Sequence, residues 1–193
     1  MEQSIDIVIR IFHWCLVLLL TCLFVSSTTV DNAEFHLFFG HLISALVVAR
    51  IAWGFLKKGE QDSWNKYLHK PEQLFRYIAK LLRKETGAAM QLHNPAGSYM
   101  SLVMMILLFL SVLTGLMMEA VFEFDGIAMV VMSHTNTETA YLIENIHTYV
   151  SYSILGLSVI HIAGVLYSSR LYGVNLPLAI ITGRIKYFGN KHE

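Results

Sequence analysis

Charged residues are scarce in this chain. Of its 193 residues, 15% are Asp, Glu, Lys or Arg and 55% are hydrophobic, whereas a soluble domain of this size is about a quarter charged. Cysteine is also scarce. The two cysteines, Cys15 and Cys22, lie in one apolar run and give no sign of a disulfide. The shortage of charge argues against a soluble domain and predicts a membrane protein.

Four apolar runs are long enough to cross a hydrocarbon core of roughly 30 Å. The first has no small-residue cleavage site and is longer than the apolar core of a usual signal peptide, so we expect a retained helix. No repeat, low-complexity segment or second domain interrupts the pattern. We predict one all-α membrane domain over 1–193, a four-transmembrane-helix bundle with spans near 7–27, 36–56, 99–118 and 146–168.

Lysine and arginine are absent from two connecting segments, 28–35 and 119–145, although these segments hold seven acidic residues. Eight of the 14 Lys and Arg residues lie between the second and third runs. Lys and Arg concentrate on the cytoplasmic side of membrane proteins. Both termini and the long middle connection are therefore expected in the cytoplasm, and the two acidic segments on the outer side.

Local signals predict further helix positions. Residues 71–85 place apolar side chains on one face and most basic ones off it, which is typical of an amphipathic helix on the cytoplasmic membrane surface. Asn94 followed by Pro95 predicts a capped start for the third membrane helix. Thr135 with Glu138 matches a capping box, so the fourth helix should begin above the membrane.

Four histidines lie within the expected membrane helices. His147 and His161 are 14 residues apart, which places them about 40° apart around one helix and roughly 21 Å apart along it. His13 lies toward the inner end of the first helix and His41 toward the outer end of the second. Any one of them alone is explained equally well by hydrogen-bonded packing. Together they match by depth as an inner pair, His13 with His161, and an outer pair, His41 with His147.

Two imidazoles from different helices suit bis-histidine ligation of haem. The chain contains no C-x-x-C-H sequence, so the haems would be of the b type, without thioether bonds. Gly40, Gly115 and Gly164 leave room beside the histidines. Arg10 and Arg50 lie at inner-haem depth, where they would pair with propionates, although each could instead anchor its helix at the membrane interface.

The histidines also allow interpretations other than two haems ligated by these four residues. His36 competes with His41 as the outer ligand, but its place at the helix start also suits a solvated residue, so His41 is favoured. A zinc site needs ligands at one depth, and a di-iron site needs a second Glu-x-x-His motif and more glutamates. A haem-free transporter or scaffold would use the histidines as a proton path, but no Asp, Glu or Lys lies deep in the spans.

Four stretches of the chain, within about residues 7–185, resemble the prokaryotic cytochrome b561 family. This family includes the diheme membrane subunits of nickel-iron hydrogenases and of formate and thiosulfate reductases. The resemblance implies the same haem ligands, His13, His161, His41 and His147, and electron exchange with a quinone in a bacterial inner membrane. The stretches are "IRIFHW", "GHLISALVVARIAWGF", "HNPAGSYMSLVMMILLFLSVLTGLMM" and "IENIHTYVSYSILGLSVIHIAGVL".

The expected function is therefore a transmembrane diheme cytochrome b, more an electron-transfer subunit than an enzyme by itself. It would pass electrons between the quinone pool and a periplasmic redox protein, either a c-type cytochrome or an iron-sulfur or catalytic subunit. The resemblance to formate dehydrogenase subunits implies a quinone role for Asn94, although the N-cap role already explains this residue. His93 lies beside Asn94 at the expected membrane surface, where it would serve as a proton carrier.

Further partners and one alternative function complete these expectations. Lipid and a possible homodimer are expected partners, and nucleic acid is not. The alternative within the family is a stand-alone oxidoreductase that uses a small outer donor such as superoxide.

Overall fold

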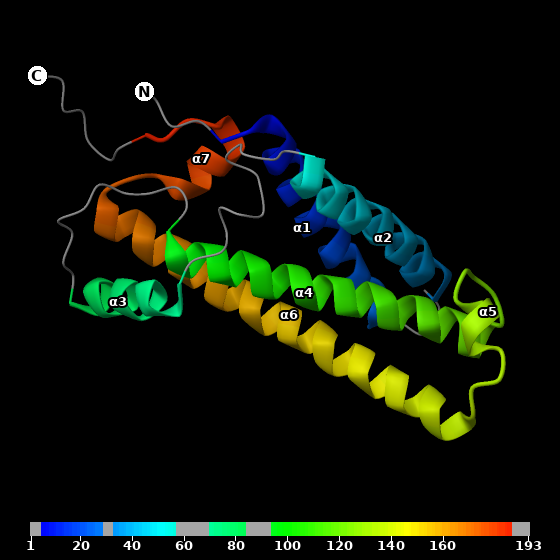
Figure 1. Ribbon diagram of the computed structural model, residues 1–193. Coiled ribbons are helices and arrows are strands. Elements are labelled where there is room, and N and C mark those ends of the chain that lie inside the picture. Colours follow the sequence, from blue (N-terminus) through cyan, green and yellow to red (C-terminus); the bar gives the residue numbers. More distant parts are fainter. Residues whose placement is uncertain (1–4, 29–32, 57–69, 84–93, 187–193) are drawn as a thin grey trace, which may run out of the picture. The chain divides into compact units, whose positions relative to one another are not determined.

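The computed structural model describes residues 5–28, 33–56, 70–83 and 94–186, and within these ranges every regular element is helical. The prediction of an all-α fold is confirmed. The elements are α1 (Ile7–Ser27), α2 (Ala33–Leu56), α3 (Pro71–Leu82), α4 (Pro95–Met118), the π-helix η3 (Glu119–Glu123), α5 (Met129–Met132), α6 (Thr137–Tyr172) and α7 (Leu176–Thr182) (Figure 1).

Among the described residues, four helices are long and apolar enough to cross a membrane, namely α1, α2, α4 continued by η3, and α6. The predicted number of membrane-spanning helices is confirmed. The helix α6 has 36 residues, about 54 Å at 1.5 Å per residue, and so exceeds the hydrocarbon core. Its cap differs from the predicted one, because Asn136 rather than Thr135 accepts a hydrogen bond, 2.8 Å long, from the Thr139 N–H.

The chain forms two compact units, and the boundaries between them fall within the long helices. Unit 1 comprises residues 1–14, 52–103 and 158–193, and unit 2 comprises residues 15–51 and 104–157. The histidines divide accordingly, with His13 and His161 in unit 1 and His36, His41 and His147 in unit 2. That the whole chain is one membrane domain stays a prediction.

The core of unit 2 consists of branched aliphatic side chains. Ile43 and Val47 of α2, Leu108 of α4 and Ile154 of α6 are each at most 5% exposed, and leucines of α1 pack against them. Other large apolar side chains point outward, among them Val48 at 63% exposure. Extensive outward apolar surface is unusual in soluble monomers and suits helices whose surroundings are lipid.

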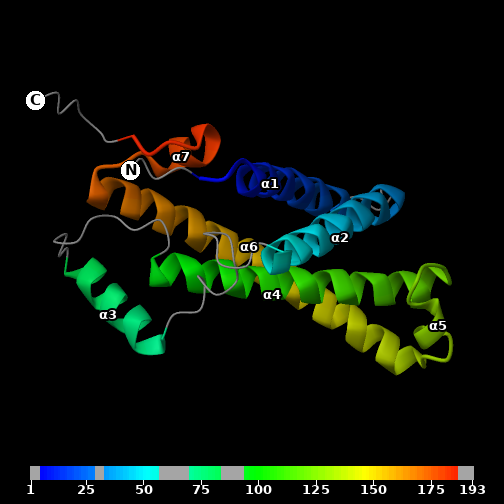
Figure 2. The same ribbon diagram turned by 45° about the horizontal axis from the view of Figure 1, so that its top comes forward.

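In unit 1, α7 joins the end of the described chain to its beginning, and Figure 2 shows it beside the start of α1. The Ile5 N–H donates to the Gly183 carbonyl over 2.9 Å, and Arg10 Nη1 donates to the Ile181 carbonyl over 2.8 Å. Asn175 caps α7 by accepting from the Leu178 N–H at 2.9 Å. The sequence analysis did not predict this short helix.

The helix α3 is tied to the end of α6 within unit 1. The Tyr167 hydroxyl donates to the Leu81 carbonyl over 3.1 Å. Burial, followed by a hydrogen bond with Tyr172, raises the pKa of Tyr77. Phe75 remains 70% exposed. A helix thus occupies most of the predicted range 71–85, of which residues 84 and 85 lie outside the described residues, and its position on the membrane surface stays a prediction.

A tight turn follows the π-helix in unit 2. Phe124 has a left-handed backbone with φ 55°, and Gly126 has φ +86°. A Cβ atom added at Gly126 would lie 2.7 Å from Glu119 Oε2. Glycine is therefore required here for two reasons, its backbone conformation and the closeness of the buried Glu119 carboxylate.

Replacing Gly126 should destabilise unit 2. For Gly126→Ala we expect a loss of about 1–3 kcal/mol, because alanine would adopt a strained backbone and crowd Glu119. The thermal midpoint, followed by circular dichroism in detergent, should fall by several degrees. Gly156→Ala is the matched control, since Gly156 lies within α6 with nothing within 4 Å of an added Cβ. Equal midpoints for the two variants would contradict the close packing at Gly126.

Candidate functional site

Unit 2 contains a cavity of about 840 Å³ between α1, α2, α4 and α6. This volume lies in the upper part of the range of small-molecule and cofactor sites, roughly 300–1,000 Å³. Most of its wall is aliphatic, with Leu20, Leu108 and Leu116 among the lining residues. Three histidines also line it, His36 and His41 from α2 and His147 from α6.

His147 is held by one ring nitrogen. Its Nδ1 lies 2.9 Å from the Thr114 hydroxyl, and a backbone hydrogen bond links the ring to Ser111. The Thr114 hydroxyl donates its proton to the Leu110 carbonyl over 2.8 Å, so toward His147 it accepts. Nδ1 therefore carries the proton, and Nε2 is left with a lone pair. This is the tautomer and the outer-shell arrangement that metal-ligating histidines use.

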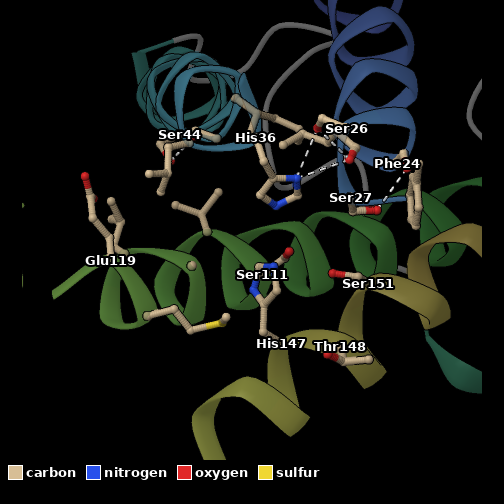
Figure 3. A pocket seen from close by; sticks show the side chains of 18 of the residues that line it. Phe24, Ser26, Ser27, His36, Ser44, Ser111, Glu119, His147, Thr148 and Ser151 are labelled. Atoms are coloured by element: carbon tan, nitrogen blue, oxygen red, sulfur yellow. Dashed lines mark hydrogen bonds between the residues drawn. The ribbon is translucent and has the colours of Figure 1, made fainter. Parts of the chain in front are cut away.

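His36 shows the same arrangement on the opposite wall. Its Nδ1 lies 3.2 Å from the Leu23 carbonyl oxygen, which can only accept a hydrogen bond. The Ser26 hydroxyl, also 3.2 Å from Nδ1, donates to the same carbonyl. His36 and His147 point toward one another from α2 and α6 (Figure 3). The two rings are close enough to interact electrostatically. Two imidazoles with available Nε2 atoms therefore line the same cavity.

His41 has a different partner. Its Nε2 pairs with Glu119 Oε2 at 3.1 Å, so the nitrogen that would face an iron is already in a hydrogen bond. The His41 side chain is 53% exposed and that of Glu119 is 10% exposed. The sequence pattern had favoured His41 over His36 as the outer ligand. The geometry favours His36.

Two glycines keep space open beside these histidines. A Cβ at Gly115 would lie 3.3 Å from His147 Cε1, so a larger residue would push the imidazole out of place. A Cβ at Gly40 would meet nothing within 4 Å, although Gly40 lines the cavity. A flat group could therefore approach α2 closely at Gly40.

Unit 1 brings together the other two predicted ligands. His13 of α1 and His161 of α6 are both partly buried and close enough to interact electrostatically. The His13 ring also lies 5.4 Å, centroid to centroid, from the ring of Trp14. The predicted inner pair is thus close together, but its ligation of a haem stays a prediction.

Arg10 lies one helical turn before His13. Its guanidinium rests on Gly183, where an added Cβ would be 3.0 Å from Arg10 Cζ. The Arg10 Nε atom is buried and has no hydrogen-bond partner among the described residues. A buried donor without an acceptor is costly, and a carboxylate such as a haem propionate would supply one. Arg50 belongs to unit 2 and is 6% exposed; its predicted propionate contact stays a prediction.

Asn94 caps α4 as the sequence indicated. Its Oδ1 accepts from the Gly97 N–H over 2.7 Å, and its carbonyl accepts from the Ser98 N–H over 3.0 Å. Its side-chain NH₂ group plays no part in either bond. His93, the proposed proton carrier, lies outside the described residues.

Among the described residues, no group of three or more His, Cys, Asp and Glu side chains is placed to hold a bare metal ion. Haem iron needs only two protein ligands, because the porphyrin supplies four nitrogens. The family model of the prokaryotic cytochrome b561 matches residues 4–183. The chain belongs to the prokaryotic cytochrome b561 family. No curated protein and no solved structure matched it.

Membership in this family establishes the general activity. A prokaryotic cytochrome b561 is a transmembrane b-type cytochrome that binds haem and transfers electrons. In unit 2, two facing imidazoles in a mostly apolar cavity, with glycines beside them, fit a haem. In unit 1, a buried guanidinium N–H donor lies one turn from His13 and suits a haem propionate.

Sequence reasoning missed the residues that hold the histidines in position. Thr114 and Ser26 are ordinary helix residues in sequence, and both hydroxyls also bond their own helix. The pairing of His41 with Glu119 joins residues 78 positions apart. One signal was available for Glu119, since a carboxylate at the end of an apolar run calls for a polar partner.

Removing the Thr114 hydroxyl should loosen haem at His147. We expect Thr114→Val to weaken haem binding there by about 10–100-fold, the usual effect of losing an outer-shell partner. Haem titration of the apoprotein, followed by absorbance, measures this. Thr21→Val is the control, because the Thr21 hydroxyl is exposed and donates to the Val17 carbonyl of its own helix. Unchanged affinity in Thr114→Val would show that the hydroxyl does not position His147.

Proposed function

We propose that this cytochrome b561 binds two b-type haems and carries electrons between a redox protein on its acidic side and quinone on its basic side. The observation that supports this most is the presence of one facing or adjacent histidine pair in each unit, His36 with His147 and His13 with His161. When bound, each haem would supply an iron that accepts and releases one electron. The protein supplies ligation, spacing and electrostatics.

For the outer haem we propose His36 and His147 as ligands. Both rings have Nδ1 bound to an acceptor and Nε2 available, and they face each other across the cavity. The proposal moves from His41 to His36 because Glu119 occupies His41 Nε2. The preference for His41 rested on its depth and on the place of His36 at the helix start, and neither identifies which ring nitrogen is available.

For the inner haem we propose His13 and His161, with Arg10 beside a propionate. The Arg10 Nη1 bond to the Ile181 carbonyl holds the guanidinium in place, and its buried Nε lacks an acceptor among the described residues. A propionate would accept a hydrogen bond from Nε and pair with the positive charge of the guanidinium.

The charge asymmetry supports an orientation with both termini in the cytoplasm of a bacterial cell and the protein in the inner membrane. Quinone would then react on the cytoplasmic side, near Asn94, whose side-chain NH₂ group remains to donate to a quinone carbonyl. The acidic segments would face the periplasm. They would repel an anionic donor such as superoxide and attract a basic protein.

The choice between His36 and His41 can be tested by haem content. We expect His36→Ala and His161→Ala each to reduce the protein from two haems to one, because each loses an axial ligand. His41→Ala should keep both. A pyridine haemochrome assay per chain, with haem-replete expression, gives the count. Loss of a haem in His41→Ala, with both retained in His36→Ala, would restore His41 as the ligand.

Replacing Asn94 should affect quinone reactivity more than haem content. We expect Asn94→Asp to keep the cap of α4, since aspartate caps helices as well as asparagine does, and to slow quinol-dependent haem reduction at least several-fold, because aspartate cannot donate the amide hydrogen bond. Stopped-flow absorbance measures this rate. Gln73→Glu on α3 is the control for an added negative charge in the same unit. A normal rate in Asn94→Asp would remove Asn94 from the quinone site.

A further inference from the structure

The turn after η3 and the helix α5 together expose four large apolar side chains within residues 124–131. We propose that these residues, Phe124, Ile127, Val130 and Val131, here termed the apolar tip, are the anchor on which a basic redox protein docks. This inference rests on the proposed function and extends it, because it assigns the docking contact to apolar residues and defines the chemistry of the partner.

The exposure of the apolar tip is extreme. Phe124 is 75% exposed, Ile127 and Val131 are each 81% exposed, and Val130 is 90% exposed. They occupy an eight-residue segment that includes part of α5, at the acidic end of α4 (Figure 1). Isolated exposed apolar residues are common on proteins, but a contiguous group outside a membrane span marks an interaction site.

The apolar tip has a defined shape, so its exposure does not arise from an unstructured loop. The Met129 N–H donates to the Gly126 carbonyl over 3.2 Å, and the Val131 N–H donates to the Ala128 carbonyl over 3.0 Å. Beneath the turn, Gly126 packs on the Glu119 carboxylate, which His41 Nε2 holds at 3.1 Å. A surface fixed in this way loses little conformational entropy when a partner binds.

The charges around the apolar tip argue for a protein rather than lipid. Segments that lie on anionic membranes place Lys and Arg beside their apolar residues. Here the exposed neighbours are Glu123 and Asp125, and residues 119–145 contain no Lys or Arg. A second copy of this chain would bring the same acids together, and like charges in contact oppose binding.

The partner that fits is therefore a protein with an apolar socket bordered by Lys or Arg. The apolar tip would fill the socket, and the acids beside it would pair with the basic border. The charges would mainly raise the association rate, and the desolvated apolar contact would supply most of the affinity. A c-type cytochrome whose exposed haem edge is ringed by lysines has this surface and serves as the probe.

A photo-crosslinking residue, p-benzoylphenylalanine, at Val130 identifies the occupant. The haem-loaded protein is placed in nanodiscs and illuminated with the basic c-type cytochrome at low salt. We expect an adduct with the mass of the cytochrome, and none when the same group replaces Phe75, an exposed apolar residue of α3. A lipid adduct alone, a homodimer alone, or no adduct at Val130 would each overturn the proposal.

Kinetics separate the apolar contact from the charges. In Val130→Ser/Val131→Ser we expect electron exchange with the c-type cytochrome to slow about tenfold, with the same dependence on salt as the wild type. Glu123→Gln/Asp125→Asn should instead weaken the salt dependence. Phe75→Ser is the control and should match the wild type.

Each outcome has a distinct meaning. If the wild type binds two haems but exchanges no electrons with the c-type cytochrome, the proposed outer partner is wrong, and the docking proposal falls with it. If the wild type reacts and the double serine variant reacts at the same rate, the proposed function stands and the apolar tip is not the anchor.

Discussion

The site depends on a simple constraint: a neutral histidine inside an apolar bundle needs an acceptor for its one N–H group, and the nitrogen without a proton keeps a lone pair. In unit 2 the proton goes to Nδ1, toward the Leu23 carbonyl for His36 and toward Thr114 and the Ser111 backbone for His147. The lone pairs on Nε2 are then left facing the cavity. Helix backbone and hydroxyl groups thereby fix the rings in the form that binds a metal.

Composition and periodicity were enough to predict the four long helices. Apolar runs of the right length predicted four membrane spans. The helix α6 begins before its predicted span, at Thr137, where Asn136 caps it. The helix α7 was missed because its stability is not local. Seven residues cannot form a stable helix alone, and α7 depends on contacts of Gly183 and Ile181 with residues at the other end of the sequence.

The candidate site was only partly predictable. Helical geometry places His147 and His161 on one face of α6, and depth pairs His161 with His13, but depth does not separate His36 from His41. That distinction depends on Glu119, 78 residues away from His41, and on a serine at the end of α1. Sequence spacing reports which face a residue occupies. It does not report which neighbour from another helix has already taken the reactive nitrogen.

The contact between Arg10 and the segment that ends at Gly183 has a consequence for biosynthesis. The acceptor of Arg10 Nη1 lies 171 residues later in the chain, and the ribosome delivers residues from the N-terminus onward. The first membrane helix therefore enters the bilayer with its guanidinium lacking this carbonyl. The environment of Arg10, and with it the pocket around His13, is complete only when almost the whole chain has been made. A chain truncated before the end of α7 would therefore lack this acceptor for Arg10.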